Sequence, residues 1–274
     1  MPKIILYCFI TLIITSCIKE VKNIKLPDNN SQKIVVECFI SPESDSISAT
    51  LSLSLPIFGD NTQRVVPIIE NATVTLSDGT NSYNIPFVDS IGKYFSKSLP
   101  FAIAPGKTYY LTVTTIDGKT VSAKCTVPIN AAIPTSFTII PRSDRPNYSS
   151  TNLKVEWQDI PGEKNFYFLT IVSQDSTREN TYPQPLYLYN NILTDEQRDG
   201  KLIVYREDDV FSLNDTSAYF VLELLTMDYN AYEFKRTQVL NEDNGPFTTP
   251  VNVHSNIQNG LGVFGAYRKM VLVK

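Results

Sequence analysis

Residues 47–55 read Ile-Ser-Ala-Thr-Leu-Ser-Leu-Ser-Leu, an unbroken alternation of apolar and hydroxyl-bearing side chains. Successive side chains of a β-strand point to opposite faces, so a period of two places every apolar residue on one face. The stretch therefore predicts a half-buried strand whose outer face, from Ser48 to Ser54, carries only hydroxyl groups. It makes a β fold the first hypothesis for the whole chain.

The same alternation recurs on both sides of this strand. It predicts further strands over residues 34–40, 72–76, 109–113 and 121–127. Asp117-Gly118 separates the last two and is the pattern of a two-residue type I′ hairpin turn. Short strands separated by turn residues are typical of a sandwich of about a hundred residues. We therefore predict an N-terminal β-sandwich domain over residues 33–131.

Proline and polar residues are frequent in residues 128–146, and we place the domain boundary near Ala132. Beyond the boundary the alternation predicts strands over residues 153–157, 166–172 and 218–225. Trp157 lies on the first of them, and we interpret it as a core residue rather than a ligand platform. A lone tryptophan on such a strand resembles the opening of fibronectin type III-like sandwiches.

One helix is predicted, near residues 227–240. Ala231, Phe234 and Gln238 have helical spacing, and Asp228 precedes them as an N-cap. The predicted fold is therefore mainly β, with two tandem β-sandwich domains similar to immunoglobulin or fibronectin III domains. The second domain, residues 132–274, is β-rich and carries the helix.

The last strand is predicted to follow a glycine-rich segment. Residues 260–267 read Gly-Leu-Gly-Val-Phe-Gly-Ala-Tyr. Glycine at every second or third place lets a backbone pack closely or turn sharply. The segment is not a phosphate-binding loop, because it lacks the strand, glycine and helix order and the Lys-Ser/Thr of that motif.

The N-terminus indicates where the protein is found. A short cationic start precedes an apolar run from Ile4 to Ile14, which is too short to span a bilayer and has the length of a signal-peptide core. Ile14-Thr15-Ser16-Cys17 resembles the bacterial lipobox, so residues 1–17 are predicted to be a lipoprotein signal peptide and Cys17 to carry lipid. Residues 18–32 are polar and read as a tether between the lipid and the domains.

Composition excludes one class of partner. The 274 residues carry a net charge of −4 and contain no Lys/Arg cluster. Nucleic-acid binding needs basic side chains that neutralise phosphates, so we do not expect a nucleic-acid partner. The expected contact with the membrane is through the lipid anchor.

Two cysteines remain after the signal peptide and the lipidation site, Cys38 and Cys125. In a chain exported from the reducing cytosol this pair can persist as a disulfide. The other interpretation is two unpaired cysteines that act as small core hydrophobes. Both cysteines lie on the apolar phase of their predicted strands, so both side chains are expected in the core of the first domain.

The most aromatic stretch of the chain, residues 182–189, is the candidate binding surface. Its tyrosines are Tyr182, Tyr187 and Tyr189. One interpretation is an exposed surface for a sugar, a peptide or a protein partner. The other is an edge segment packed on its own domain, since Pro183 and Pro185 exclude a central strand there.

No catalytic or metal-ligating constellation stands out in the sequence, and no cofactor is expected. His254 is the only histidine, without identifiable partners for a serine triad or a zinc site. Acid-rich spots at 195–196, 207–209 and 242–243 are read as solvated loops, and none has the alternating acid spacing of an EF-hand loop. Paired carboxylates could still serve a hydrolase.

Three Asp-Ser-apolar or Asp-Ser-Thr triplets resemble the O-glycosylation sites of exported Bacteroidota proteins. They centre on Ser46, Ser90 and Ser176, all at predicted turns.

The chain as a whole resembles a family of Bacteroidota outer-membrane lipoproteins, domain of unknown function 4249. Three segments carry the resemblance: the lipobox followed by Lys33-Ile34-Val35-Val36-Glu37, the stretch from Asn71 to Val113, and the carboxy-terminal run from Tyr229 to Gly265. The resemblance implies an envelope lipoprotein, often encoded near TonB-dependent transporters, and it supplies no catalytic residues. It favours the cell-surface side of the outer membrane over the periplasmic side.

Two classes of function follow. The first is a non-catalytic binding or accessory lipoprotein that works beside an outer-membrane, TonB-dependent transporter. Two tandem sandwiches with loops at their ends suit binding. The alternative is a carboxylate-based hydrolase that acts on glycans or peptides at the cell surface. It requires titratable groups that converge in a pocket.

Overall fold

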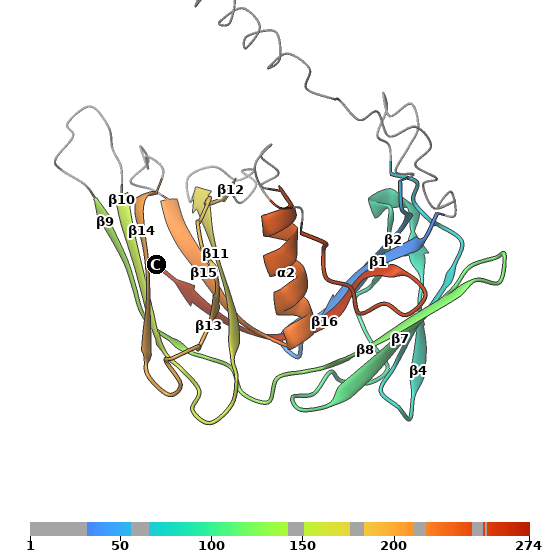
Figure 1. The fold of residues 1–274 in the computed structure, drawn as a ribbon, viewed down its shortest axis with the longest axis horizontal. Helices are drawn as coiled ribbons and strands as arrows, with labels where there is room; N and C mark the ends of the chain where they lie inside the picture. Colours follow the sequence, from blue (N-terminus) through green and yellow to red (C-terminus); the bar gives the residue numbers. More distant parts are fainter. Residues whose placement is uncertain are drawn as a thin grey trace, which may run out of the picture.

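The structure, a computed structural model, describes residues 32–55, 66–141, 151–175, 184–210, 218–242, 249 and 251–274 (Figure 1). The predicted signal peptide, Cys17 and nearly all of the tether lie outside the described residues, as do Tyr182 and Ser176. Among the residues that are described, no helix combines the length and the apolarity needed to cross a membrane.

Two sheets face each other in the first sandwich. One sheet contains β1 (Ile34–Ile40), β2 (Ile47–Leu53), β6 (Lys93–Ser96) and β5 (Phe87–Val88), paired in that order. The other contains β4 (Ser82–Ile85), β3 (Thr73–Ser77), β7 (Thr108–Thr114) and β8 (Thr120–Thr126). A short 3₁₀ helix, η1 (Asp89–Ile91), connects β5 to β6.

The alternation along these strands produces the core between the sheets. In β2, Ile47, Ala49 and Leu51 are buried, whereas Ser48 on the other face is exposed. Each apolar face can be removed from water only against the face of another sheet, which is why the strands pair into two layers rather than one. The expected strand over residues 34–40 is thus confirmed, and the one over residues 47–55 is confirmed from Ile47 to Leu53.

The second sandwich has the same two-layer arrangement. Its larger sheet contains β12 (Gln184–Pro185), β11 (Phe166–Asp175) and β15 (Ala218–Met227), and β13 (Ile192–Thr194) also pairs with β11. The facing sheet contains β14 (Leu202–Val210), β10 (Thr151–Gln158) and β9 (Pro134–Pro141). Trp157 is fully buried between them, with its ring 5.5 Å from that of Tyr167, so it is a core residue as predicted.

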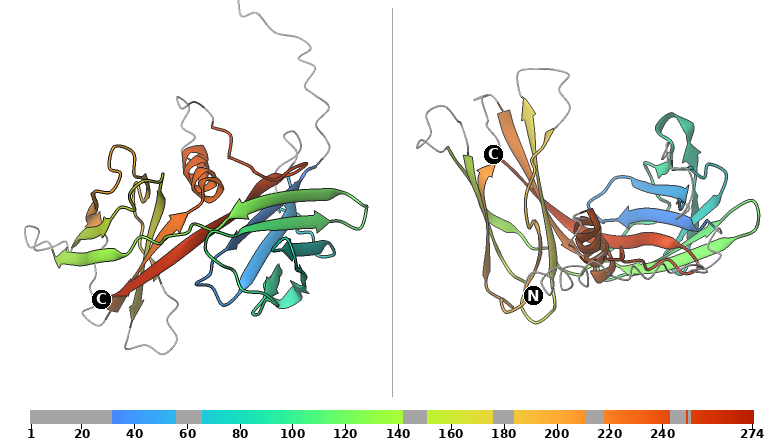
Figure 2. Two further views of the ribbon diagram at one scale, coloured as in Figure 1. Left: turned by 90° about the horizontal axis from the view of Figure 1, so that it is seen from below. Right: turned by 45° about the horizontal axis from the view of Figure 1, so that its top comes forward.

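One strand joins the two sandwiches. The first part of β16 (Leu261–Val273) pairs in parallel with β1, from Val35 opposite Leu261 to Ile40 opposite Ala266. The second part pairs antiparallel with β15, from Met227 opposite Tyr267 onwards. The larger sheets of both sandwiches are therefore one nine-stranded sheet. Figure 2 shows β16 crossing from one sandwich to the other.

Because β16 pairs with strands of both sandwiches, a division of the chain at residue 132 does not assign it to one domain alone. The predicted division assigns all of β16 to the second domain, whereas its first six residues pair with the first strand of the first domain. The sheet order follows from long-range pairing, which the alternation of a single strand does not encode.

The helix α2 (Tyr229–Glu242) is the one α-helix in the described part of the chain, within two residues of the predicted bounds. Its N-cap is the predicted one: the amide of Ala231 donates a hydrogen bond to the Asp228 carboxylate at 2.8 Å. The helix lies between the sandwiches in Figure 1. Ala231 and Met227 form a buried cluster with Phe166, against which Phe39 of β1 also packs.

The mainly β fold, the sandwich-like sheets and the single helix confirm the predicted fold class. The likeness to immunoglobulin or fibronectin III domains stays a prediction. Three details were wrong. Asp195, which was read as part of a solvated loop, is buried, with an exposed fraction of 6 %. Only Gly118 of the Asp117-Gly118 pair has a positive φ, of 83°, so the turn is not type I′. The acids at 207–209 lie on β14 rather than in a loop.

Cys38 and Cys125 are free thiols buried in the core of the first sandwich. Cys38 pairs across from Phe264 of β16, and Cys125 pairs across from Tyr109 of β7, so β1 and β8 are not hydrogen-bonded neighbours. Burial, followed by the nearby Glu37 carboxylate, raises the pKa of the Cys38 thiol to about 12. In this structure the two cysteines are unpaired core residues, as in the second interpretation. A disulfide between them in the exported protein stays a hypothesis.

The glycines before and within β16 have the role that the sequence predicted. A Cβ on Gly260 would lie 2.7 Å from the carbonyl oxygen of Ile34, and one on Gly265 would lie 2.8 Å from the Cβ of Ala231. Gly262 has a φ of 102°, and a Cβ there would overlap the carbonyl group of Val36. The parallel pairing of β16 with β1 therefore requires glycine at positions 260 and 262, and the packing of α2 against β16 requires it at position 265.

We expect Gly262→Ala to lower the free energy of unfolding by at least about 3 kcal/mol, because it combines an unfavourable φ with a clash against main chain. Gly118→Ala is the matched control. Gly118 has a φ of 83° but nothing within 4 Å of the added Cβ, so we expect a loss of about 1–2 kcal/mol. Urea unfolding followed by circular dichroism measures both. Equal losses of unfolding free energy in the two variants would show that the close contact between Gly262 and Val36 does not contribute to stability.

Candidate functional site

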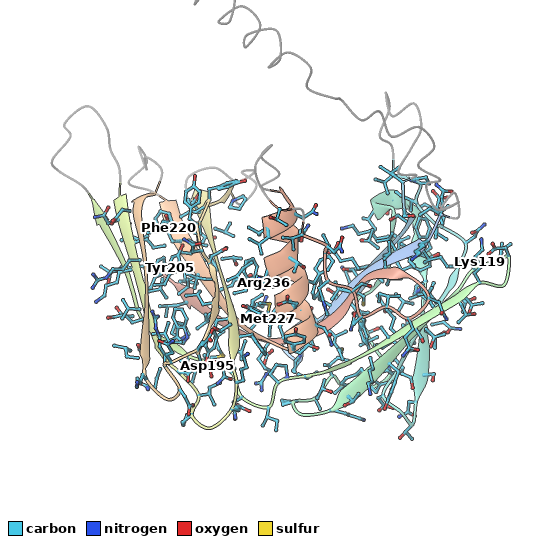
Figure 3. The ribbon with its side chains drawn as sticks, in the orientation of Figure 1. Lys119, Asp195, Tyr205, Phe220, Met227 and Arg236 are labelled. Atoms are coloured by element: carbon cyan, nitrogen blue, oxygen red, sulfur yellow. The ribbon has the colours of Figure 1, made fainter. Side chains whose placement is uncertain are left out.

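A groove of about 380 Å³ lies where the two sandwiches meet, beside α2. We call it the junction groove. It is lined by Glu37, Phe39, Ser44, Ser46, Ser48, Thr50, Lys93, Phe168, Leu225, Met227, Lys235 and Tyr267. These residues come from strands of both sandwiches, from the β1–β2 loop and from the helix. Met227 is labelled beside α2 in Figure 3.

In β1 and β2, the residues that line the groove are those on the outer face of the sheet, and they alternate with the core residues of the first sandwich. Glu37 and Phe39 alternate along β1 with the buried Val36 and Cys38, and Ser48 and Thr50 alternate likewise along β2. Ser48 and Thr50, two residues of the predicted hydroxyl face, thus lie in one wall of the groove. Aromatic side chains of both sandwiches, Phe39, Phe168 and Tyr267, provide apolar surface in the same groove.

Charge in the junction groove is weakly paired. The Lys235 ammonium lies 3.9 Å from a carboxylate oxygen of Glu37 and 5.3 Å from the centre of the Phe39 ring. A partly exposed ion pair of this length contributes little to stability, so both groups are available to a ligand at small cost. Lys93 adds a second ammonium.

The rim of the groove is held by a better-buried ion pair. The Nε of Arg268 on β16 donates to Glu43 at 2.6 Å, and the Lys269 amide donates to the same carboxylate at 3.1 Å. Burial alone would raise the pKa of Glu43, but hydrogen bonds from Arg268, Ser41 and Lys269 lower it overall. Because Glu43 lies in the β1–β2 loop, these contacts fix that loop against the shared strand.

Two of the three tyrosines predicted as a binding surface lie within the described residues, and both are exposed. Tyr187 is 79 % and Tyr189 is 68 % exposed, with ring centres 6.4 Å apart. Leu186 and Leu188 alternate with them and pack against the core of the second sandwich. The segment follows the edge of the sheet, where the amide of Leu186 donates to the carbonyl of Ile171 at 2.8 Å. The segment therefore packs on its own domain through its leucines and exposes two of its tyrosines.

The main chain of Tyr189 is fixed by β14. Its amide donates to the Glu207 carboxylate at 2.9 Å, and its carbonyl accepts a hydrogen bond from the Tyr205 hydroxyl at 2.7 Å. Burial and then the hydrogen bond to Glu207 raise the pKa of Tyr205, so its hydroxyl remains a donor. The exposed rings are therefore presented on a fixed backbone.

His254 makes structural contacts with α2. Its amide donates to the Thr237 hydroxyl at 2.8 Å, its Nε2 lies 3.2 Å from Asn230 Oδ1, and its ring contacts Tyr229 edge to face. The histidine therefore holds the segment after α2 against the helix. None of these contacts brings it to a nucleophile.

The two described serines of the glycosylation triplets are accessible. Ser46 is exposed immediately before β2 and lines the junction groove. Ser90 is exposed on η1. Their modification stays a prediction.

Sequence reasoning missed most of the junction groove. Glu37 and Phe39 lie on the outer, otherwise polar face of β1. A phenylalanine on such a face was the one feature of the sequence that indicated a site there. Phe168 on β11 and Lys235 on α2 carried no signal, because their approach to Phe39 depends on β16 joining the sandwiches.

Comparison with known proteins gives one strong result. A family model with the description Domain of unknown function (DUF4249) matches residues 19–271. No curated protein matches the chain. Among the solved structures that match is one titled "Cytokine receptor complex - Crystal form 2". It is 12 % identical in sequence, and the alignment covers 72 % of this chain and 92 % of that chain. Its TM-score of 0.24 is too low to support any argument.

Asp228, the N-cap of α2, has an unusual environment. Burial raises the pKa of its carboxyl group to about 6, although main-chain hydrogen bonds from Ala231, Ala266 and Thr126 act in the opposite direction. The usual value for an aspartate in an unfolded chain is about 3.9. Between these two values the folded protein holds a proton that the unfolded chain has lost.

We expect the contribution of Asp228 to stability to be complete below about pH 4 and to be lost as the pH rises through 6. The loss is on the order of 2–3 kcal/mol. Asp228→Asn keeps a side chain that can cap the helix but does not titrate. Urea unfolding of both proteins from pH 4.5 to 7.5 measures the effect. The wild type should lose stability relative to the variant across this range, and parallel curves would contradict the prediction.

Proposed function

We propose a function for this chain on the premise that it belongs to the family Domain of unknown function (DUF4249). It is a non-catalytic cell-envelope lipoprotein of the kind found in Bacteroidota. It binds a ligand or a protein partner and works as an accessory component beside an outer-membrane, TonB-dependent transporter.

The observation that carries this proposal is the junction groove. Its volume of about 380 Å³ is in the range of small-molecule sites, and such sites often lie between domains. Hydroxyl groups of Ser48 and Thr50, the Lys93 ammonium and the aromatic faces of Phe39 and Tyr267 are complementary to a polar ligand with apolar edges. A sugar or a peptide has this character.

The distribution of acids supports binding over hydrolysis. A glycosidase uses two carboxyl groups that flank the bond to be cleaved. Among the described residues that line the junction groove, Glu37 is the one carboxylate. The carboxylate-based hydrolase remains the alternative that turnover measurements would detect.

The lipid anchor completes the proposal. The lipobox motivates lipidation of Cys17 and attachment to the outer membrane, with the surface-facing side favoured by the family resemblance. The first sandwich begins at Ile34, so a tether of residues 18–32 would separate it from the bilayer. Chains in this arrangement can contact an integral membrane protein from its aqueous side.

The test is affinity purification from native membranes, with the anchor intact. We expect reproducible recovery of a TonB-dependent transporter with the wild-type chain, and loss of membrane association and of recovery with Cys17→Ala. Absence of any transporter, together with turnover that disappears when one carboxylate pair is mutated, would overturn the proposal in favour of the hydrolase.

A variant within the junction groove tests the site separately. Ser48 is exposed on the outer face of β2, so Ser48→Tyr fills the groove without changing the core. Thr112→Tyr is the matched control, since Thr112 is an exposed hydroxyl residue on β7 outside the groove. We expect recovery of the partner to fall about tenfold with Ser48→Tyr only, equivalent to about 1.4 kcal/mol. Equal recovery would exclude the groove as the binding site.

A further inference from the structure

Three carboxylates meet at one end of the second sandwich. One oxygen each of Asp159, Asp195 and Asp199 lies within 4.8 Å of the others. Asp159 follows β10, Asp195 follows β13, and Asp199 lies in the loop that leads to β14. The cluster therefore joins loops from both sheets of this sandwich. Figure 3 labels Asp195 at the lower end of the sandwich.

Two of these carboxylates have hydrogen-bond donors. Asp159, which is 1 % exposed, accepts from the Tyr167 hydroxyl at 2.5 Å and from the Gly200 amide at 2.8 Å. Asp199 is exposed and accepts from the Gly162 amide at 2.7 Å. These bonds orient both side chains and leave further lone pairs on each carboxylate.

Asp195 is different. It is only 6 % exposed, and its carboxylate has no hydrogen-bond donor and no ion-pair partner among the described residues. Three carboxylates within 4.8 Å of one another repel each other, and a cation between them would offset this repulsion. None of the three has a lysine or arginine ion pair within the described ranges.

We propose that Asp159, Asp195 and Asp199 bind a divalent cation, Ca²⁺. Ca²⁺ takes six to eight oxygen ligands from carboxylates, carbonyls and water in flexible geometry. Zn²⁺ is less suitable, because its sites usually include histidine or cysteine, and neither is in the cluster. Mg²⁺ requires near-ideal octahedral geometry and retains more of its water.

The loop sequence supports this choice. Residues 195–200 read Asp-Glu-Gln-Arg-Asp-Gly, with a side-chain oxygen at positions one, three and five and glycine at position six. The full alternating acid spacing of an EF-hand loop is absent, because glutamine replaces the acid at the third position, but the side-chain oxygens and the glycine of its first half are present. Gly200 has the positive φ, of 63°, that favours glycine at such a turn. The second half departs from the pattern, because Arg206 occupies the position of the bidentate glutamate. Asp159 supplies a carboxylate from another strand instead.

The expected role of the ion is to fasten the two sheets of the second sandwich. The loop already contacts β10 through the amide of Asp159, which donates to the carbonyl of Lys201 at 3.0 Å. A cation held by residues after β10 and β13 would add a cross-link that the unfolded chain lacks. The folded state would then be stabilised in proportion to the free ion concentration. This site is separate from the junction groove and independent of the function proposed for it.

The test uses the full chain in detergent, stripped with EDTA and titrated with CaCl₂. For a dissociation constant of 10⁻⁴–10⁻³ M, typical of extracellular calcium modules, about 10 mM Ca²⁺ should increase the folding equilibrium constant about 10- to 100-fold. We expect this increase for the wild type and for Glu196→Gln, an exposed acid of the same loop. We expect none for Asp195→Asn, which removes the unpartnered charge and should fold at least as well without the ion.

A second readout uses the neighbouring tyrosine. Tb³⁺ replaces Ca²⁺ in oxygen sites, and the Tyr167 hydroxyl bonded to Asp159 would sensitise its luminescence. Luminescence displaced by Ca²⁺, and weakened in both Asp195→Asn and the exposed Asp199→Asn, supports the proposal. It is overturned if the wild type shows neither stabilisation nor displaceable Tb³⁺, if the aspartate variants respond as the wild type does, or if Mg²⁺ acts at the same concentration as Ca²⁺.

Discussion

The structure depends on one strand that changes partners. β16 pairs in parallel with β1 up to Ala266 and antiparallel with β15 from Tyr267. A parallel pair needs a crossover connection, and here nearly the whole chain lies between the two strands. The carbonyl of Val36 approaches so closely that only glycine fits at position 262. This contact makes the larger sheets of both sandwiches continuous, and the relative position of the sandwiches follows from it.

The helix stabilises the point at which β16 changes partners. Ala231 of α2 packs against Gly265, and Asp228 is tied to the strand through its amide, which donates to the carbonyl of Ala266 at 2.9 Å. The helix thus covers the sheet where its two parts meet. A hinge at this position would have to break main-chain pairing and apolar packing together.

The two candidate sites have different origins. The junction groove is made of outer-face residues, such as Phe39 and Ser48, that do not take part in the cores formed by the inner faces. The carboxylate cluster is made of loop residues after strand ends, and Asp195 is buried there without a partner. The first arrangement suits an exchangeable ligand. The second suits a structural cation, since closely spaced carboxylates require a counter-charge.

The sequence by itself determined the strands whose inner and outer faces differ in polarity, the helix after Asp228, and the need for glycine before and within the last strand. These features are local, because alternation, capping and backbone freedom act within a few residues. It did not determine that Leu261 pairs with Val35, or that Asp159 meets Asp195. Partners of this kind are chosen by the packing of whole faces, and any apolar face can pack against several others. Only the tertiary structure decided which faces met.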